Sequence, residues 1–295
     1  MRLLCVHAHF DDFEFVAAGT FELWKRKPDA DVKTRLLVCT DGQGGHYCRT
    51  REETGRIRLE EQAASARIGG YEFEPLRLPD GRVPRETFLE SEPFALAALW
   101  QSIRCFEPDY LFCPPVVSDP LAGVHVDHAA VAEAVRKVAY LINVPHAFTP
   151  EYPADERVSQ PCKVPVILSA FDSYSGGANQ YDFAVDVEEA FPRICAMSYC
   201  HQSQIAEWLP WIGRHQIEPP KSLSDWSNNL RRRFARRNAQ LGISSAHPVE
   251  AFSVTAWGTV PTAEQLARDF PNIRPDPTRW DGLKRRLDQW RANLF

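Results

Sequence analysis

The sequence predicts an α/β fold built on a mostly parallel sheet with helices on both faces, and three observations lead to this prediction. Short apolar runs alternate with longer segments of helical periodicity through the first half of the chain. Polar clusters directly follow three of the apolar runs, as loops at the carboxyl edge of a parallel sheet do. The 295 residues are 44% hydrophobic and 25% charged, a composition that can bury a core.

The elements of the first half follow one another in strand and helix order. Strands are predicted over residues 3–6, 35–39 and 110–113, and helices over 15–24, 57–68, 94–103 and 129–141. The helix over 57–68 ends at Gly69-Gly70, a helix stop, and the third strand is halted by Pro114-Pro115. Such alternation indicates right-handed βαβ units.

The second half is less regular. Strands are predicted over 164–168, 181–185 and 249–257, with an amphipathic helix over 187–197 and a final helix from Gly282 onward. The pattern between residues 208 and 226 is helical and rich in tryptophan. We expect one domain over 1–260, with a C-terminal helical extension over 261–295 packed on it.

Composition excludes several classes of protein. The net charge of -5 favours neither a nucleic-acid nor a membrane partner, and the basic run 231–237 is predicted to be a solvated helix face. The cysteines include no CxxC pair, which is typical of a reducing compartment. With neither a secretory segment nor an apolar run of about 18 residues, we expect a cytoplasmic protein. Homo-oligomerisation stays open.

The segment with the most chemistry is His7-Ala8-His9-Phe10-Asp11-Asp12, directly after the first predicted strand. Two more polar clusters, residues 40–45 and 119–128, follow the next strands, and the later one adds His125 and His128. Loops after parallel strands share one edge of the sheet, so these side chains can meet. Hydrolytic zinc sites use three such imidazole or carboxylate ligands and leave one position for water.

Residues 8–14 (AHFDDFE), followed by 18–20 (AGT), resemble the AHPDDxExxxGGT signature of LmbE-like (PIG-L) zinc N-deacetylases. The similarity continues in the family's order. It covers a T-x-G-x-x-G loop at 40–45, an R-x-x-E helix from 58 to 69, a PDG turn at 79–81, HxDH at 125–128 and HxSQ at 201–204. Each segment alone is weak evidence for the family, but six segments in the family's order make a specific resemblance.

The resemblance implies a Rossmann-like fold and a metal-dependent N-deacetylase, a hydrolase of carbon–nitrogen bonds other than peptide bonds. It implies that His9, Asp12 and His128 bind one Zn²⁺ per chain and that Asp11 is the general base. His125 would polarise the carbonyl or, in its protonated form, stabilise the oxyanion, with Asp127 holding its ring. The implied substrate is a small N-acetylated amino sugar of the N-acetylglucosamine type.

Three residues are candidates for substrate binding, each with a structural alternative. Arg58 could instead form a helix-surface pair with Glu61. Asp41 and the glycines after it could cradle a phosphate, but their spacing is not GxGxxG, and a tight turn lining the pocket is favoured. His201 could instead be a packed polar residue. Phe10 stands where the family has proline, a departure that bears on substrate fit more than on the metal.

Other readings of the same residues stay open. HxHxDD nearly matches the HxHxDH of metallo-β-lactamase-like hydrolases and opens like the HxH of amidohydrolase barrels, so His7 could belong to a binuclear site. The wider motif set favours one zinc, with His7 in a supporting role. The chain could also be an amidase for a larger thiol or peptide conjugate, or a non-catalytic sugar- or nucleotide-binding module.

Overall fold

One mixed sheet organises the protein. The computed structural model describes residues 1–28, 31–89, 92, 94–152, 161–213, 218–274 and 276–293. Its strands lie in the order β3-β2-β1-β4-β5-β7-β6-β8. They are β1 (Arg2–His7), β2 (Lys33–Val38), β3 (Glu72–Pro75), β4 (Tyr110–Cys113), β5 (Val166–Ala170), β6 (Phe183–Asp186), β7 (Val249–Val254) and β8 (Ile273–Arg274). The five neighbouring strands β3, β2, β1, β4 and β5 are parallel, and the pairings of β7, β6 and β8 that continue the sheet are antiparallel. This arrangement confirms the predicted mostly parallel sheet.

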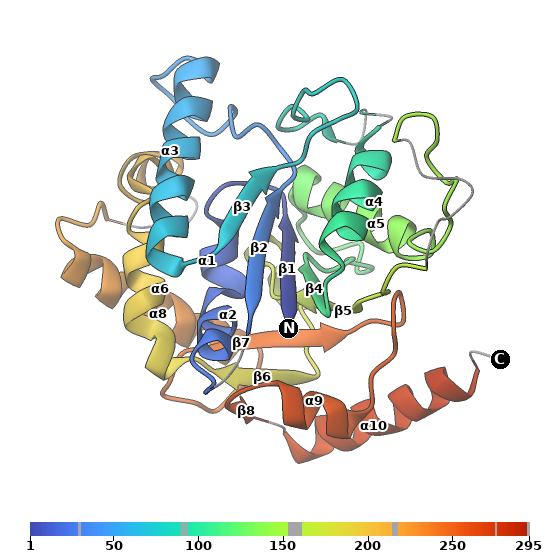
Figure 1. Ribbon diagram of the computed structural model, residues 1–295. Coiled ribbons are helices and arrows are strands. Elements are labelled where there is room, and N and C mark those ends of the chain that lie inside the picture. Colours follow the sequence, from blue (N-terminus) through green and yellow to red (C-terminus); the bar gives the residue numbers. More distant parts are fainter. Residues whose placement is uncertain are drawn as a thin grey trace.

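Helices cover both faces of the sheet (Figure 1). One face carries α1 (Asp12–Val16), α2 (Ala18–Lys25), α3 (Arg51–Gly69), α6 (Phe191–Ser198) and α8 (Leu223–Gln240), and the other carries α4 (Ala95–Phe106) and α5 (Val126–Ala139). Three short helical segments are η2 (Ser173–Ala178), η3 (Glu188–Ala190) and the π-helical η4 (Ser203–Trp208), which runs into α7 (Leu209–Ile212). The C-terminal part holds α9 (Ala263–Asp269) and α10 (Pro277–Ala292).

The strands divide their side chains between two cores. In β1, Leu3 and Cys5 pack with α2 and α6, whereas Leu4 and Val6 pack with α4 and α5. Because successive side chains of a strand point to opposite faces, a strand covered on both faces is apolar throughout. This is why the continuous apolar runs of the sequence predicted the central strands correctly.

The order of the strands places the chemistry-bearing loops together. β1 pairs with β2 on one side and with β4 on the other, with Cys5 opposite both Leu36 and Phe112. The chain therefore adds β2 and β3 on one side of β1 and then crosses over to add β4 and β5 on its other side. The loops after these two strands face each other across this switch point, where open α/β sheets bind ligands.

The predicted helix 15–24 is two helices. α1 ends at Val16 and α2 begins at Ala18, because the backbone of Ala17 is not helical. The carboxylate of Glu250, from β7, accepts the backbone N–H groups of Gly19 and Thr20 at 2.8 and 2.7 Å. A carboxylate at a helix N-terminus satisfies otherwise unpaired donors, so a residue from the antiparallel half holds α2 in place.

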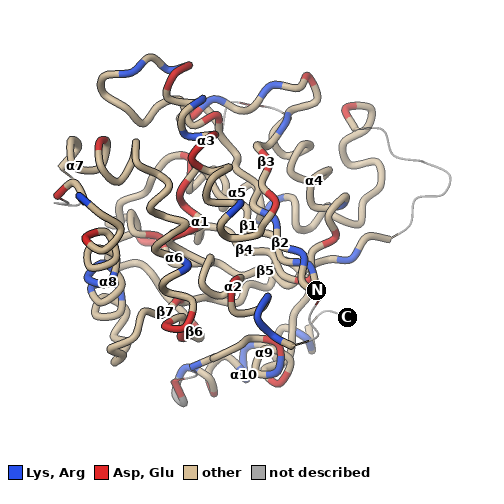
Figure 2. The backbone as a smooth tube through the Cα atoms, turned by 60° about the vertical axis from the view of Figure 1, so that its left-hand side comes forward, with Lys and Arg blue, Asp and Glu red and all other residues tan. Residues whose placement is uncertain are grey.

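The prediction of a solvated face for the basic run on α8 was wrong for two of its arginines. Figure 2 shows the basic residues along this helix. Arg231, Arg232 and Arg236 are exposed, but Arg237 is only 6% exposed and donates to the backbone carbonyls of Phe15 and Val249. Arg233 also points inward, toward the pocket described below.

The C-terminal segment joins the same sheet. β8 pairs antiparallel with β6, and α10 buries Leu283 and Leu287 in the core. α10 begins at Pro277, earlier than predicted, because the Asp276 side chain caps it by accepting the Arg279 N–H. Within the described part of the chain, no helix has both the length and the apolar character needed to cross a lipid bilayer.

Candidate metal centre

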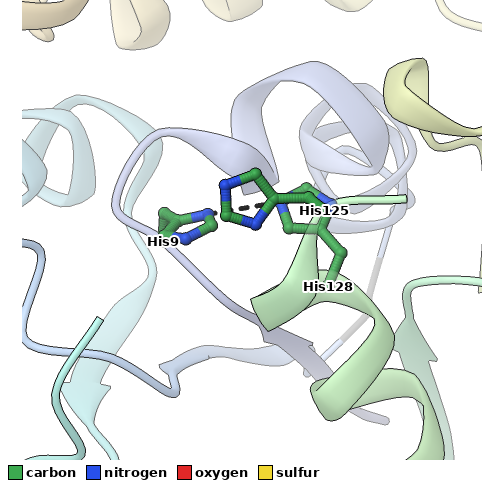
Figure 3. A group of neighbouring side chains, drawn as sticks. All are labelled: His9, His125 and His128. Carbon is green, nitrogen blue, oxygen red and sulfur yellow. Dashed lines mark hydrogen bonds between the residues drawn. The ribbon is translucent and has the colours of Figure 1, made fainter. Parts of the chain in front are cut away.

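Three donor atoms converge at the switch point. His9 Nδ1 lies 3.2 Å from both Asp12 Oδ2 and His128 Nε2, and His128 Nε2 lies 3.4 Å from Asp12 Oδ2. Ligands about 2.0–2.1 Å from a tetrahedral zinc ion are about 3.3 Å apart. Figure 3 shows the rings of His9 and His128 meeting from the loop after β1 and the start of α5. The spacing of the three donors fits a zinc ion.

The outer nitrogens of the two imidazoles are held by carboxylates. His9 Nε2 lies 3.0 Å from Asp127 Oδ2, and His128 Nδ1 lies 3.2 Å from Asp172 Oδ2. When each ring holds one proton, on its outer nitrogen, the inner nitrogens are acceptors that face each other and Asp12. Burial lowers the pKa of His9 and His128, but the neighbouring carboxylates outweigh it and raise these pKa values to about 9 and 10. The site therefore favours a positive charge at the inner nitrogens, which a proton or a metal ion can supply.

Sequence reasoning missed Asp172. It follows β5 directly and caps η2, where its Oδ1 accepts the Tyr174 N–H at 2.9 Å. Its other oxygen fixes the ring of His128. The signal that identified the other clusters, a polar residue just after an apolar strand, also applies here. It was missed because the predicted strand ended at residue 168, and Asp172 then lay in an unassigned stretch.

His7 supports the centre through Asp12. Its Nδ1 lies 2.6 Å from Asp12 Oδ2, the same oxygen that faces His9 and His128. Burial lowers the pKa of His7, and in the tautomer with its proton on Nδ1 the neutral ring donates to this carboxylate. Although burial raises a carboxyl pKa, the three imidazoles hold the pKa of Asp12 well below its usual value. The described residues also include three other groups of possible metal donors: His7, Asp12 and His128; His9, His125 and His128; and His9, Glu86 and Asp127.

Asp11 lies beside these donors in a strained conformation. It precedes α1 with a φ of 88°, a left-handed value that aspartate tolerates better than most residues. Its N–H donates to Gln62 Oε1 at 3.1 Å, and its Oδ1 lies 3.3 Å from Arg58 Nη2. Burial raises the pKa of Asp11 to about 6, although the Arg58 guanidinium acts in the opposite direction. A carboxyl with this pKa can take up and release a proton near neutral pH.

Arg58 belongs to the site and not to a helix surface. It is 3% exposed, lines the pocket and donates to the Phe10 carbonyl at 2.8 Å. Glu61, the partner in the surface-pair alternative, instead accepts the backbone N–H and hydroxyl of Ser203 at 2.7 and 2.6 Å. The surface-pair alternative is therefore wrong.

His125 and Asp127 meet, but not through the atoms the resemblance implied. The Asp127 N–H donates to His125 Nδ1 at 3.3 Å, while the Asp127 carboxylate bonds His9 and the Thr87 N–H. Burial, together with the neighbouring His9 and His128, lowers the pKa of His125 to about 4. His125 is therefore neutral and presents an Nε2–H donor.

Two of the three expected substrate contacts lie off the pocket wall. Asp41 Oδ1 accepts the N–H groups of Gln43 and Glu86, both at 3.1 Å, and so fixes the loop after β2. His201 is fully buried, with its Nε2 3.2 Å from Glu14 Oε1. Gln204, from the same HxSQ segment, lines the pocket instead.

Phe10, which stands where the resembled signature has proline, packs against Gly42 in the loop after β2. Gly42 has a φ of 63°, and a Cβ placed on it would lie 2.5 Å from the Phe10 ring. Only glycine accepts both the left-handed backbone and the close ring. The aromatic residue at the family's proline position is thus accommodated by a glycine.

Comparison with known proteins matches the segment that holds the candidate metal ligands. Residues 4–139 match the model of PIG-L, described as GlcNAc-PI de-N-acetylase. This matched stretch, the PIG-L segment, is somewhat less than half of the chain. A comparison with curated protein sequences finds no match.

Solved structures resemble most of this chain in fold. N,N'-diacetylchitobiose deacetylase from Pyrococcus horikoshii is 19% identical, with 86% of this chain and 83% of that chain covered and a TM-score of 0.62. The conserved protein TT1542 from Thermus thermophilus is 20% identical, with 85% and 93% covered and a TM-score of 0.58. GalB, the 4-carboxy-2-hydroxymuconate hydratase from Pseudomonas putida, is 17% identical, with 86% and 95% covered and a TM-score of 0.55. At these identities the likeness establishes the fold.

The PIG-L segment supplies only part of the pocket lining. The pocket measures about 690 Å³, including the part open to solvent, and the candidate metal ligands and Asp11 are among the residues that line it. Residues beyond 139 supply the rest: Phe171, Asp172, Ser173, Tyr174, Gln204, Trp208, Leu209 and Arg233.

Proposed function

We propose that the protein is a zinc-dependent hydrolase that removes the N-acetyl group from an amino sugar of the N-acetylglucosamine type. The observation that carries this proposal is the set of three donor atoms, 3.2 to 3.4 Å apart, with Asp11 and His125 in the same pocket. The PIG-L match and the fold likeness to a chitobiose deacetylase support the substrate class. We assign one zinc ion per chain to His9, Asp12 and His128.

When bound there, zinc supplies Lewis acidity, which polarises a carbonyl and lowers the pKa of water to about 7. Asp11 takes the proton of the attacking water, since its pKa of about 6 leaves it ionised at neutral pH. The same carboxyl then returns this proton to the departing amine. The acetyl group leaves as acetate and the sugar as a free amine.

His125 stabilises the developing oxyanion as a neutral donor. Its Nδ1 accepts the Asp127 N–H, which directs the ring proton to Nε2. Its lowered pKa argues against the protonated form that an imidazolium mechanism requires. A neutral imidazole held in a fixed orientation donates a hydrogen bond without a further proton transfer.

The proposal is tested by acetate release from N-acetylglucosamine and N,N'-diacetylchitobiose by zinc-loaded protein. We expect acetate and free amine in equal amounts, with loss of both on chelation. An amidase for larger conjugates would leave both sugars intact and cleave acylated thiol or peptide conjugates. A hydratase or a non-catalytic binding module would release no acetate from any acylated amine, and that result would refute the proposal.

A further inference from the structure

One arginine of the pocket wall has a buried guanidinium nitrogen without a hydrogen-bond partner among the residues that the structure describes. Arg233 reaches the pocket from α8, outside the PIG-L segment. Its guanidinium lies over the Phe15 ring, 4.3 Å from the ring centroid. Its Nη1 is buried without a hydrogen-bond partner among the described residues, and none of their carboxylates forms an ion pair with it.

Neighbouring arginines differ from Arg233 because they bond the protein through their terminal nitrogens, although the Nε atoms of Arg58 and Arg237 are also buried without a partner. Arg237, one turn further along α8, donates to two backbone carbonyls. Arg231 makes two hydrogen bonds to the Glu188 carboxylate, at 2.9 and 3.0 Å. Arg58, buried in the same pocket, contacts Asp11 and a backbone carbonyl. Because a buried charged donor without a partner is costly, Arg233 is held ready for a partner from outside the chain.

The surroundings of Arg233 define what this partner is attached to. Besides the metal ligands and Arg233, the pocket wall includes Phe15, Phe171, Trp208 and Leu209. Trp208 also stacks on Trp211, with ring centroids 5.3 Å apart. Apolar and aromatic walls suit the body of a sugar ring. The planar guanidinium in the same wall suits a carboxylate or phosphate, which accepts two parallel hydrogen bonds.

We propose that Arg233 forms an anion subsite and that the substrate sugar carries a carboxylate or phosphate group in addition to its N-acetyl group. This inference rests on the proposed function for the position of the N-acetyl group, at the metal ligands. The anion at Arg233 distinguishes this substrate from neutral N-acetylglucosamine. Arg233 is thus a specificity-determining residue supplied by the part of the chain outside the PIG-L segment.

The test is calorimetric binding of three deacetylated sugars to the zinc-loaded protein at fixed ionic strength, since such sugars cannot be turned over. They are glucosamine, glucosamine 6-phosphate and muramic acid, which offer no anion, a phosphate and a carboxylate. We expect at least one anionic sugar to bind about tenfold or more tightly than glucosamine. The preferred one identifies the anion.

Arg233→Met should abolish this preference and leave the affinity for glucosamine unchanged. Arg236→Met, which removes an exposed arginine of the same helix, is the matched control and should keep the preference. Arg233→Lys keeps the charge without the planar fork and should retain only part of the preference, a check that stands if the methionine variant fails to fold.

Three results would overturn the subsite: equal affinity for all three sugars, no binding of either anionic sugar, or a preference that survives in Arg233→Met. The last would mean that the anion binds elsewhere, for example on the metal itself. A protein that releases acetate from N-acetylglucosamine but shows one of these results keeps the proposed function and loses the subsite. A protein that prefers an anionic sugar but releases no acetate keeps the subsite and loses the proposed function.

Discussion

Glu14 and His201 meet in the core, with His201 Nε2 3.2 Å from Glu14 Oε1 and neither side chain exposed to solvent. The pair joins the first motif, on α1, to the HxSQ segment, 187 residues later. Gln62 and Tyr71 also donate to Glu14 Oε1, at 2.9 and 2.8 Å. Against the effect of burial, each partner favours the charged form of the other, which lowers the pKa of Glu14 and raises that of His201.

Replacing His201 with alanine should therefore destabilise the fold, because the buried carboxylate of Glu14 loses its cationic partner. We expect a loss of about 3–5 kcal/mol in the free energy of unfolding, measured with urea. His247→Ala, which removes an exposed histidine, is the control and should cost much less. Similar losses in both variants would show that the buried pair is not a stabilising contact.

Asp11→Asn should separate catalysis from metal binding. Asparagine matches aspartate in shape and tolerates the left-handed backbone at this position, so the loop should keep its conformation. Without a base, turnover should fall at least about 100-fold while zinc content, measured by elemental analysis, stays unchanged. His128→Ala should lose the zinc as well. Equal zinc loss in the two variants would contradict the roles assigned to Asp11 and His128.

Asp172→Asn should weaken zinc binding without removing a ligand. The amide is a poorer acceptor for the His128 Nδ1–H, so the ring is less basic and less firmly oriented. We expect zinc affinity, measured by competition with a chelator, to fall about 10- to 100-fold. Asp119→Asn, an exposed position, provides the comparison. Unchanged affinity in Asp172→Asn would mean that this contact does not tune the metal.

The charge of Arg58 should determine the pH at which activity is lost on the acid side of the pH profile. The base form of Asp11 is lost as pH falls through its pKa, and Arg58 lowers that pKa. Arg58→Gln should therefore move the acid limb of kcat/KM to higher pH, by about one unit. Arg58→Lys keeps the positive charge and should leave the limb close to that of the wild type. A limb unmoved in Arg58→Gln would show that Asp11 is not the titrating base.

His7→Ala decides between one metal and two. His7 contacts the proposed ligand Asp12 and is not itself a proposed ligand. We therefore expect about one zinc per chain in both the wild type and the variant. Elemental analysis of protein purified without added metal measures this content. Two metals in the wild type, falling to one or none in the variant, would favour a binuclear hydrolase that uses His7 as a ligand.

Sequence reasoning succeeded where the signal is local. The central strands were evident because both faces are covered, so residues such as Leu3 and Leu4 are both apolar. His9, Asp12 and His128 lie in loops directly after such strands, and the topology brings them together. Short edge strands such as β8, of two residues, carry too little pattern to predict.

What the sequence did not predict depends on contacts between distant segments. Arg237 looked solvated because its acceptors, the carbonyls of Phe15 and Val249, belong to other elements. Arg233 shares the same basic run, and only the packing of α8 turns it toward the pocket. The carboxylate of Asp127 selects His9 over His125 by side-chain geometry, which spacing along the chain does not specify.

The hydrogen bonds from Gly19 and Thr20 to Glu250 bear on protein engineering. A truncated protein ending at residue 139 would keep His9, Asp12 and His128 but lose the strand β5, Asp172 and the acceptor that anchors the start of α2. The stretch that matches the family model therefore does not form a complete site when transferred alone. Chimeras designed to exchange substrate preference should keep the strands of the sheet from one parent and vary segments that line the pocket, among them the part of α8 that carries Arg233.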